Sequence, residues 1–373
     1  MKVKFSDVVR RANTKEDRFN TDKEFYVGGE HMITGEYLIT RRGTIAGSNI
    51  GPMFYFGFKK GQVLLASRSP DLKKAGMVTF DGICSEKTFV IETKDESVLL
   101  QDFLPAIVRS ESFWKYANDN QSGSVNHFIN WTTFANYEFD LPDIETQRKL
   151  STLLWAMERT KTAYKNLIAK TDELVKSQFI EMFGNPITNS KGWPTQPIKC
   201  VAPEYAPAIP TEDKYWWLNL DMIESYSGCV IEKVYAERCE IGSSTSTFDK
   251  TMVLYSKLRP YLNKVVVPED YGYATTELVG LRPDPKVLNK YFLFNLLRSD
   301  DFVAFSTGLS GGAQMPRMPV KALREFQCIL PPMQLQEQFV AFSQQSDKSK
   351  FAAQQALADL TATQKALMRQ YLG

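Results

Sequence analysis

Residues 141–184 read LPDIETQRKLSTLLWAMERTKTAYKNLIAKTDELVKSQFIEMFG, and residues 330–373 read LPPMQLQEQFVAFSQQSDKSKFAAQQALADLTATQKALMRQYLG. A shift of 189 positions superimposes residues 103–184 on residues 292–373 without a gap. Gln147 then meets Gln336, and Gly184 meets Gly373. A gapless register through a loop and a long helical segment is hard to obtain by chance. The sequence therefore predicts two copies of one module of roughly 185 residues.

Each copy ends in a segment with the pattern of a long helix. Neither proline nor glycine occurs between Asp143 and Phe183, and apolar residues recur at helical spacing. Asp143 suits the N-cap, while Gly184 and Pro186 suit the end of a helix. Such a helix is about 60 Å long at 1.5 Å per residue. Residues 332–372 predict the same helix in the second copy. One row repeats in sevens, interrupted only by Lys161: Leu154, Ile168, Val175 and Met182.

A single helix of this length cannot bury its apolar stripe alone. We therefore predict that the two helices pair as an antiparallel coiled coil, with one globule at each end of the resulting rod. The alternative is that each helix packs only on its own globule. The residues expected at the helix–helix or partner interface are Leu150, Leu153, Leu154, Met157, Leu167, Ile168, Leu174, Val175, Phe339, Phe342, Leu357, Leu360, Leu367 and Met368.

The segments before the helices predict an α+β fold, with two tandem α/β globules. Strand-like runs cover residues 62–66, 88–91 and 264–267, and short helices are expected over residues 99–110 and 287–299. In this part the repeat is looser: residues 64–68 align with 253–257, and Ser85-Glu86 with Thr276-Glu277 after a small shift. The predicted divisions are a first globule at 1–142, a first helix at 143–184, a second globule at 185–331 and a second helix at 332–373.

Composition narrows the class of protein. Hydrophobic residues make up 43% of the chain, which predicts folded material. No run of about 18 apolar residues and no signal-peptide core occur, so we expect a cytoplasmic protein. The five cysteines form no CxxC pair and the chain has two histidines, so neither a disulfide framework nor a metal site is predicted.

Net charge alone does not indicate nucleic-acid binding. The formal charge is +2. Residues 1–140 carry 18 basic and 18 acidic side chains, and residues 185–331 carry 16 of each. A basic surface would therefore have to arise from the placement of side chains in the fold.

Several motifs together resemble the specificity subunit of type I restriction-modification systems, over essentially the whole chain. They are the Leu-Pro-x-x-x-x-Gln junctions that end at Gln147 and Gln336, the helix exit at residues 179–186, residues 254–261 and the loop at residues 308–317. The family commonly has glutamate before the junction glutamine, where this chain has Thr146 and Leu335. The first module follows the family pattern less well than the second, with Ser67-Arg68-Ser69-Pro70 where the second has Ser256-Lys257-Leu258-Arg259-Pro260.

The resemblance implies a non-catalytic subunit that reads a split DNA target, one half per globule, with the helices setting the spacing. It also implies two methylation subunits that use S-adenosylmethionine, and restriction subunits that consume ATP with Mg²⁺. No cofactor or metal is expected in this chain.

Reading base edges requires forked or planar donors, and registration on phosphates requires cations. A solvated loop without any DNA contact is the ordinary alternative for each such residue. His127 is more simply a surface histidine. The candidate DNA-binding residues are Arg41, Arg42, Arg68, Lys73 and Lys74 in the first module, beside the loop at residues 121–127, and Lys257, Arg259, Lys264, Gln314 and Arg317 in the second.

Two other classes of function remain open. A metal-dependent nuclease is disfavoured because the carboxylates near Asp143 lie at a helix start and are not kept in the second copy. No strand-borne GxGxxG, Walker lysine loop or amino-methyltransferase quartet is present. A coiled-coil scaffold that binds only proteins stays consistent with two neutral globules.

Overall fold

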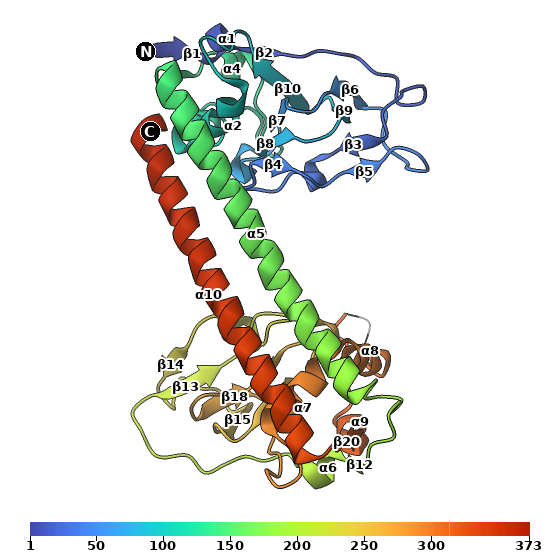
Figure 1. The fold of residues 1–373 in the computed structure, drawn as a ribbon. Coiled ribbons are helices and arrows are strands. Elements are labelled where there is room, and N and C mark those ends of the chain that lie inside the picture. The colour runs from blue at the N-terminus through green and yellow to red at the C-terminus, as the bar shows by residue number, and fades with distance from the viewer. Residues whose placement is uncertain (313) are drawn as a thin grey trace. The chain divides into compact units, whose positions relative to one another are not determined.

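Two compact units make up the chain in the computed structural model, which describes residues 1–312 and 314–373. Unit 1 comprises Met1–Asn166 and Ala353–Gly373, and unit 2 comprises Leu167–Ala352. The two long helices are α5 (Ile144–Phe183) and α10 (Met333–Leu372), as the sequence predicted (Figure 1). Both units contain part of each helix, so each globule packs against segments of α5 and α10. That arrangement differs from the alternative of one helix per globule.

Unit 1 contains two larger sheets and one short strand pair. Its helices are α1 (Phe5–Val8), α2 (Leu104–Ile107), α3 (Glu111–Asp119) and α4 (Trp131–Ala135), with 3-10 turns η1 (Gly29–His31), η2 (Pro70–Leu72) and η3 (Gln101–Phe103). The pair joins β1 (Lys2–Lys4) to β11 (Glu138–Asp140). One sheet has the order β2 (Val9–Arg11), β10 (Thr88–Thr93), β7 (Val63–Ala66), β8 (Ala75–Val78) and β4 (Leu38–Ile39); the other has β5 (Gly43–Thr44), β3 (Phe25–Val27), β9 (Gly82–Ser85) and β6 (Phe54–Phe58).

Unit 2 repeats this plan. Its helices are α6 (Ile198–Val201), α7 (Lys290–Arg298), α8 (Asp300–Gly308) and α9 (Val320–Glu325), with η4 (Leu220–Met222) and η5 (Pro260–Leu262). The short pair is β12 (Thr195–Pro197) with β20 (Gln327–Ile329). The four-stranded sheet has the order β14 (Val234–Ala236), β13 (Tyr215–Leu218), β18 (Gly272–Thr275) and β15 (Thr245–Phe248). The three-stranded sheet has the order β17 (Val265–Val266), β16 (Val253–Ser256) and β19 (Leu278–Leu281). In both units the same strand of the four-stranded sheet pairs in parallel, β3 with β9 and β13 with β18, so the duplication extends to topology.

The register of the repeat in the strands differs from the predicted one by a residue. Strand β7 begins at Val63 and β16 at Val253, and their 3-10 turns begin at Pro70 and Pro260, a shift of 190. The predicted alignment of residues 64–68 with 253–257 was therefore wrong. The predicted alignment of Ser85-Glu86 with Thr276-Glu277 was wrong as well, because β9 and β18 are also offset by 190 residues. Unit 1 has one additional residue between its strands and its helical half. The structural equivalent of Arg259 is Ser69.

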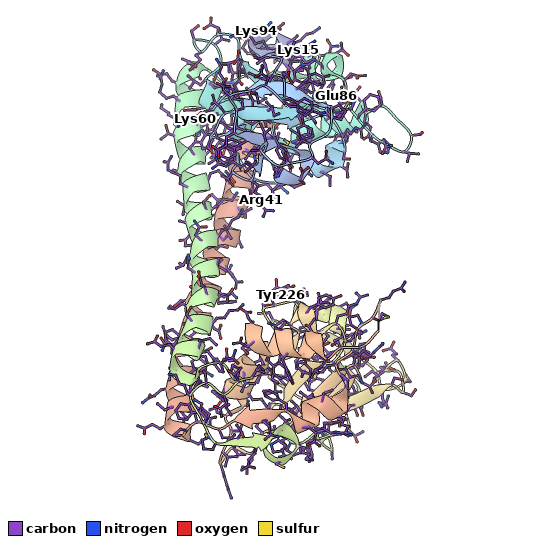
Figure 2. All side chains as sticks on the ribbon, turned by 90° about the vertical axis from the view of Figure 1, so that its right-hand side faces the viewer. Lys15, Arg41, Lys60, Glu86, Lys94 and Tyr226 are labelled. Carbon is purple, nitrogen blue, oxygen red and sulfur yellow. The ribbon has the colours of Figure 1, made fainter. Side chains whose placement is uncertain are left out.

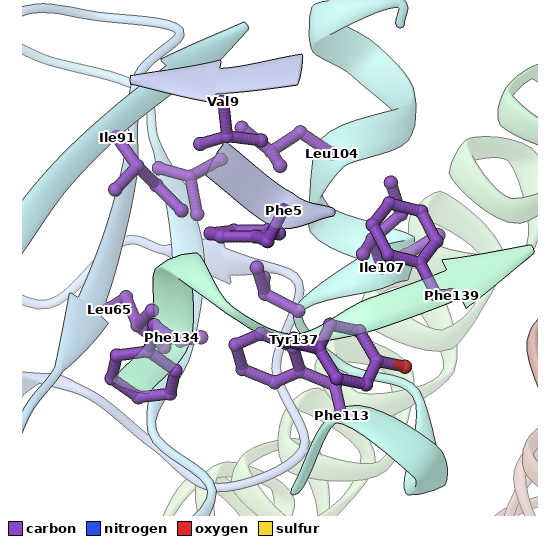
Figure 3. Packing of buried hydrophobic residues seen from close by; sticks show 14 of the residues in the cluster. Phe5, Val9, Leu65, Ile91, Leu104, Ile107, Phe113, Phe134, Tyr137 and Phe139 are labelled. Atoms are coloured by element: carbon purple, nitrogen blue, oxygen red, sulfur yellow. The ribbon is translucent and has the colours of Figure 1, made fainter. Parts of the chain in front are cut away.

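Aromatic packing dominates the core of unit 1 (Figure 3). Phe113 stacks on Phe134 with ring centroids 5.3 Å apart, and Tyr137 meets the edge of Phe113 at 5.1 Å. Phe5 and Ile107 close the same cluster. Unit 2 has an equivalent core, in which Phe179 and Phe183 of α5 pack against Phe339 of α10.

The junction glutamines anchor each long helix to its globule. Gln147 and Gln336 are fully buried. The side chain of Gln147 accepts from Leu100 N at 3.0 Å and donates to the carbonyls of Val98 and Pro142, each at 2.9 Å. Gln336 makes the same three bonds, accepting from Asn289 N at 2.9 Å.

The predicted helix ends are confirmed. Asp143 accepts from Thr146 N at 2.8 Å as the N-cap of α5. Gly184, with a φ of +74°, takes the left-handed position after its last turn.

Side chains of α5 and α10 meet within each unit. In unit 1, Lys161 Nζ donates to Glu158 Oε1 at 2.8 Å and to Gln364 Oε1 at 2.9 Å, and Gln364 Nε2 donates to Glu158 at 2.9 Å. All three side chains are buried. In unit 2, Lys350 Nζ donates to Asp172 at 2.7 Å. The lysine that interrupts the heptad row therefore lies inside the helical contact and has its own partners.

The predicted interface residues differ in burial. Leu150, Leu154 and Phe339 are buried in the two cores, whereas Leu153, Leu167 and Leu174 are exposed on α5. The residues that are partly covered are Met157, Ile168, Val175, Phe342, Leu357, Leu360, Leu367 and Met368. Among the described residues, no helix is both long and apolar enough to cross a membrane, and no cluster of three or more potential metal ligands occurs.

Candidate nucleic-acid interface

In unit 2, the turn after β16 and the loop before α9 form one surface. Leu258 forms a bridge with Arg317, and Met318 N donates to Lys257 O at 2.9 Å. Arg259 N donates to Pro316 O at 2.7 Å. We call this surface, made of residues 257–259, 310–312 and 314–317, recognition surface 2. Ala313, in the middle of the predicted loop, lies outside the described residues.

Unit 1 builds the same surface with different side chains. Arg68 forms a bridge with Phe128, and Ser69 N donates to His127 O at 3.0 Å. Ser122 and Phe128 exchange backbone hydrogen bonds of 2.8 and 2.9 Å, as Gly311 and Arg317 do in unit 2. Recognition surface 1 comprises residues 67–69 and 121–128. The backbone is thus duplicated, while the side chains it presents are not.

A left-handed residue forms the centre of each turn. Ser69 and Arg259 have φ of 50° and 49°, and a proline fixes the first residue of the 3-10 turn that follows. A non-glycine residue in this region costs about 1–3 kcal/mol and is often retained at a functional site. In Arg259 the conformation places a long cationic side chain, which is exposed, at the loop.

The two arginines of recognition surface 2 differ in their partners. Arg317 pairs with Glu277 at 3.1 Å, and the side chain of Arg317 remains 46% exposed. Arg259 is in no salt bridge among the described residues. Gln314 is exposed on the same loop. A hollow of about 340 Å³ beside this surface is lined by Lys257, Tyr205, Ser246 and Thr276.

Lys74 and Lys264 occupy equivalent places and have internal partners. Lys74 Nζ donates to Gly29 O and Lys264 Nζ to Leu220 O, each at 2.6 Å. Both carbonyls belong to the first residue of a 3-10 turn, η1 or η4. Burial lowers the pKa of Lys264. These ammonium groups hold the turns in place in the structure.

The remaining candidates lie on other parts of unit 1. Arg42 is centred 3.7 Å from the ring of Phe25, next to strand β5. Arg41 is exposed at the edge of unit 1 (Figure 2). Lys73 is exposed at the end of η2, with a φ of 49°. Of the first-module candidates, the structure thus places Arg68 within recognition surface 1.

The fold and part of the sequence match known proteins, although no protein-family model matches the chain. The chain is 22% identical over 297 residues to the type I restriction enzyme EcoDI specificity subunit of Escherichia coli, which covers 68% of this chain and 64% of that protein. The S subunit of a type I restriction-modification system from M. genitalium aligns with a TM-score of 0.62, at 11% identity, over 100% of this chain and 96% of that one. A chain from a structure on complex assembly and conformational transition of the type I R-M system gives 0.58, at 18% identity, over 100% and 97%.

The chain is thus similar in fold, and over 297 residues in sequence, to type I restriction-modification specificity subunits. It spans less than two thirds of the length of the Escherichia coli relative.

Sequence reasoning missed two features of the structure. The first is that Lys161, which interrupts the apolar row, belongs to a buried cluster with Glu158 and Gln364. A lysine and a glutamate three residues apart on a buried stripe signal an internal ion pair. The second is a salt bridge in each unit between the globule and one of the long helices, α10 in unit 1 and α5 in unit 2. Glu111 pairs with Arg369 at 2.7 Å in unit 1, and Asp300 with Lys176 at 2.6 Å in unit 2. No local sequence pattern indicates these salt bridges.

Proposed function

We propose that this chain is the DNA-sequence-reading subunit of a type I restriction-modification complex, with one globule for each half of a split target. The observation that carries the proposal is the pair of recognition surfaces. Each is built by the same backbone hydrogen bonds between a left-handed turn and a short loop, yet each presents its own side chains. Two readers of different half-sites need this combination of a constant frame and variable contacts.

Arg259 and Gln314 are the groups in surface 2 best suited to base edges, because Arg259 offers a fork of donors, Gln314 offers a planar amide with a donor and an acceptor, and both are exposed. Lys257 supplies a cation for a phosphate from the same turn. In surface 1 the corresponding cation is Arg68. Arg317 is proposed as a further DNA contact of surface 2, and its hydrogen bond to Glu277 orients its guanidinium. Arg41, Arg42, Lys73, Lys74 and Lys264 are proposed to act in phosphate contact or in holding the frame.

We further propose that α5 and α10 pair along their length as an antiparallel coiled coil. The contacts inside each unit support this: Lys161 of α5 contacts Gln364 of α10 in unit 1, and Asp172 of α5 contacts Lys350 of α10 in unit 2. The residue number rises on α5 while it falls on α10, as in an antiparallel pair. The functional division is then residues 1–142 and 185–331 for reading, and residues 143–184 and 332–373 for spacing.

The exposed leucines of α5 leave apolar surface for partners, and we assign it to two methylation subunits, with restriction subunits joining the complex. We propose that the chain itself is non-catalytic and cytoplasmic. S-adenosylmethionine, ATP and Mg²⁺ would be used by the partner subunits.

Single substitutions in the reconstituted complex test the division of labour. Arg259→Ala should cost about 1–3 kcal/mol at one position in one half of the target and leave the other half unchanged. Lys257→Ala should weaken binding evenly across sequences, and Arg68→Ala should act on the other half or on phosphate contacts alone. Lys286→Ala, an exposed lysine outside both surfaces, is the control. An Arg259 variant that alters both halves together would contradict the two-reader proposal, and a complex without any sequence preference would favour a protein scaffold.

A further inference from the structure

Unit 2 contains a pocket of about 340 Å³ that the proposed DNA reading does not use. It lies among α5, α10 and the junction of α7 with α8. Val175, Phe179 and Ile180 form an apolar part of its wall, and Arg298 and Asn263 line it as well. Tyr226, at the surface of unit 2 in Figure 2, stands at its edge and is 63% exposed.

Two buried polar atoms at this pocket have no hydrogen-bond partner among the described residues. The side chain of Asn263 is 6% exposed; its Nδ2 donates to Arg298 O at 2.9 Å, but its Oδ1 accepts nothing. Arg298 donates from Nη2 to the carbonyl of Tyr226, and its buried Nε donates to nothing. The buried Nε of Arg109, which the 189-residue shift places opposite Arg298, has no partner in unit 1 either. Buried polar side chains are normally satisfied, so the unpaired Oδ1 of Asn263 indicates a place where a further group binds.

Unit 1 shows what occupies the equivalent place there. Arg109, the counterpart of Arg298, donates to Gly35 O at 2.6 Å. Its guanidinium carbon lies 4.5 Å from the centre of the Tyr37 ring. Tyr37 is 1% exposed, and its ring meets Trp155 at 5.6 Å while its hydroxyl lies 3.7 Å from Met368 Sδ. An aromatic side chain of the chain itself thus covers this arginine.

Unit 2 has no aromatic side chain at the position of Tyr37, although the ring of Phe294, which does not line the pocket, is centred 4.6 Å from the guanidinium carbon of Arg298. Gly35 and Tyr226 are equivalent, because both accept from the arginine and both have a positive φ, +86° and +67°. Two residues further on, Tyr37 corresponds to Gly228. A side chain at Gly228 would collide with the carbonyl of Val265, so unit 2 has no room to place a ring from this position of the backbone.

The helical wall is also smaller in unit 2. The 189-residue shift replaces Leu154 with Ser343 and Trp155 with Gln344. Ser343 lines the pocket. The apolar and aromatic volume that fills unit 1 is therefore absent at these positions of unit 2.

The charges around the pocket favour a cation. Lys350 pairs with Asp172 at 2.7 Å, and Lys176 with Asp300 at 2.6 Å. Asp301 and Asp347 also line the pocket, and neither is in a salt bridge among the described residues, although Arg298 and Lys350 lie close enough to Asp347 to lower the pKa of its carboxyl against the effect of burial. A ligand that brings a positive charge would complement these two carboxylates.

We propose that this pocket binds an aromatic side chain, flanked by a basic residue, from a partner polypeptide. The ring would take the place in the pocket that Tyr37 fills in unit 1, on the side of Arg298 that lines the pocket, and the basic neighbour would face Asp301 and the outer part of the Asp347 carboxylate. A polypeptide is the occupant we choose because the equivalent place in unit 1 is itself filled by a tyrosine of a polypeptide chain. The proposal is independent of the DNA-reading function and fails or holds separately from it.

Binding of small probes to the full-length chain tests the proposal. The probes are the capped peptide Lys-Tyr-Lys, the matched peptide Lys-Leu-Lys, and tyramine, measured by ligand-observed NMR titration. We expect the tyrosine peptide to bind and the leucine peptide to bind about tenfold more weakly or not at all. The double variant Asp301→Asn/Asp347→Asn should weaken the tyrosine peptide about two- to fivefold.

Filling the pocket provides the specific control. Ser343→Leu introduces the side chain that unit 1 has at this position and should abolish binding of the tyrosine peptide. Ser349→Leu makes the same change at an exposed position of α10 outside the pocket and should leave binding unchanged. Thermal unfolding of both variants confirms that they fold.

Each other outcome overturns the proposal. If tyramine binds in a Ser343-dependent manner and the peptide does not, the occupant is a free small molecule. If neither probe binds, or if binding survives Ser343→Leu in a folded protein, the pocket is not an aromatic site.

Discussion

Replacing Gln336 by methionine should destabilise unit 2 far more than any change to a nearby exposed glutamine. Gln336 is fully buried and makes three hydrogen bonds, to Asn289 N at 2.9 Å, Val287 O at 3.0 Å and Pro331 O at 2.8 Å. Methionine keeps the volume and the unbranched shape but offers none of these bonds. Each bond contributes about 1 kcal/mol net, so the free energy of unfolding should fall by roughly 3 kcal/mol.

Urea unfolding followed by circular dichroism, with a parallel thermal scan, measures this effect. A loss of about 3 kcal/mol corresponds to a fall in Tm of roughly 6–12 °C for a body of 150–250 residues. Gln338→Met, two residues along the same helix and exposed, is the control and should change stability by about 0.5 kcal/mol or less. A loss below about 1 kcal/mol for Gln336→Met, or equal losses for both variants, would refute the view that this side chain anchors α10 to the globule.

Three further predictions concern the helices and the cysteines. Lys161→Ala should cost about 3–5 kcal/mol because it leaves the buried Glu158 carboxylate unpaired, and urea unfolding should show partial recovery when Glu158 is replaced by leucine as well. Arg369 and Lys365 lower the pKa of Glu111 to about 2. The stabilisation that this carboxylate provides is therefore present above its unfolded pKa of about 4.3 and is lost as the pH falls towards 2. The unfolding midpoint of Glu111→Gln should differ from that of the natural chain at pH 6 and coincide with it near pH 2. Burial raises the pKa of the two buried thiols to about 12, so mass spectrometry after alkylation of the folded protein should find modification only at the exposed cysteines, which are Cys200, Cys229 and Cys239.

Long-range order along the helices could be predicted from sequence because it depends on a simple periodicity. The extents of α5 and α10 follow from the absence of proline and glycine and from the residues at their ends, Asp143 and Gly184. The duplication of the fold follows from the gapless alignment of the helical halves. Both signals are local or repetitive, so one sequence is enough to reveal them.

Features that depend on contacts between distant segments could not be predicted in this way. The one-residue difference in register between strands and helices arises from an insertion that leaves the hydrophobic pattern unchanged. The internal partners of Lys74 and Lys264 are backbone carbonyls that lie 45 and 44 residues away in the sequence. No pattern of side chains in the sequence marks these carbonyls. The pocket beside Arg298 became visible only by comparing what fills each unit.

The central claim, a reader of two half-sites, is tested most directly by mapping adenine methylation genome-wide after co-expression of the chain with the genes that neighbour its own. We expect a split motif with a fixed gap between its halves, and we expect exchange of residues 1–142 for the first module of another family member to change one half only. Methylation without a split motif, or an exchange that alters both halves, would contradict the claim.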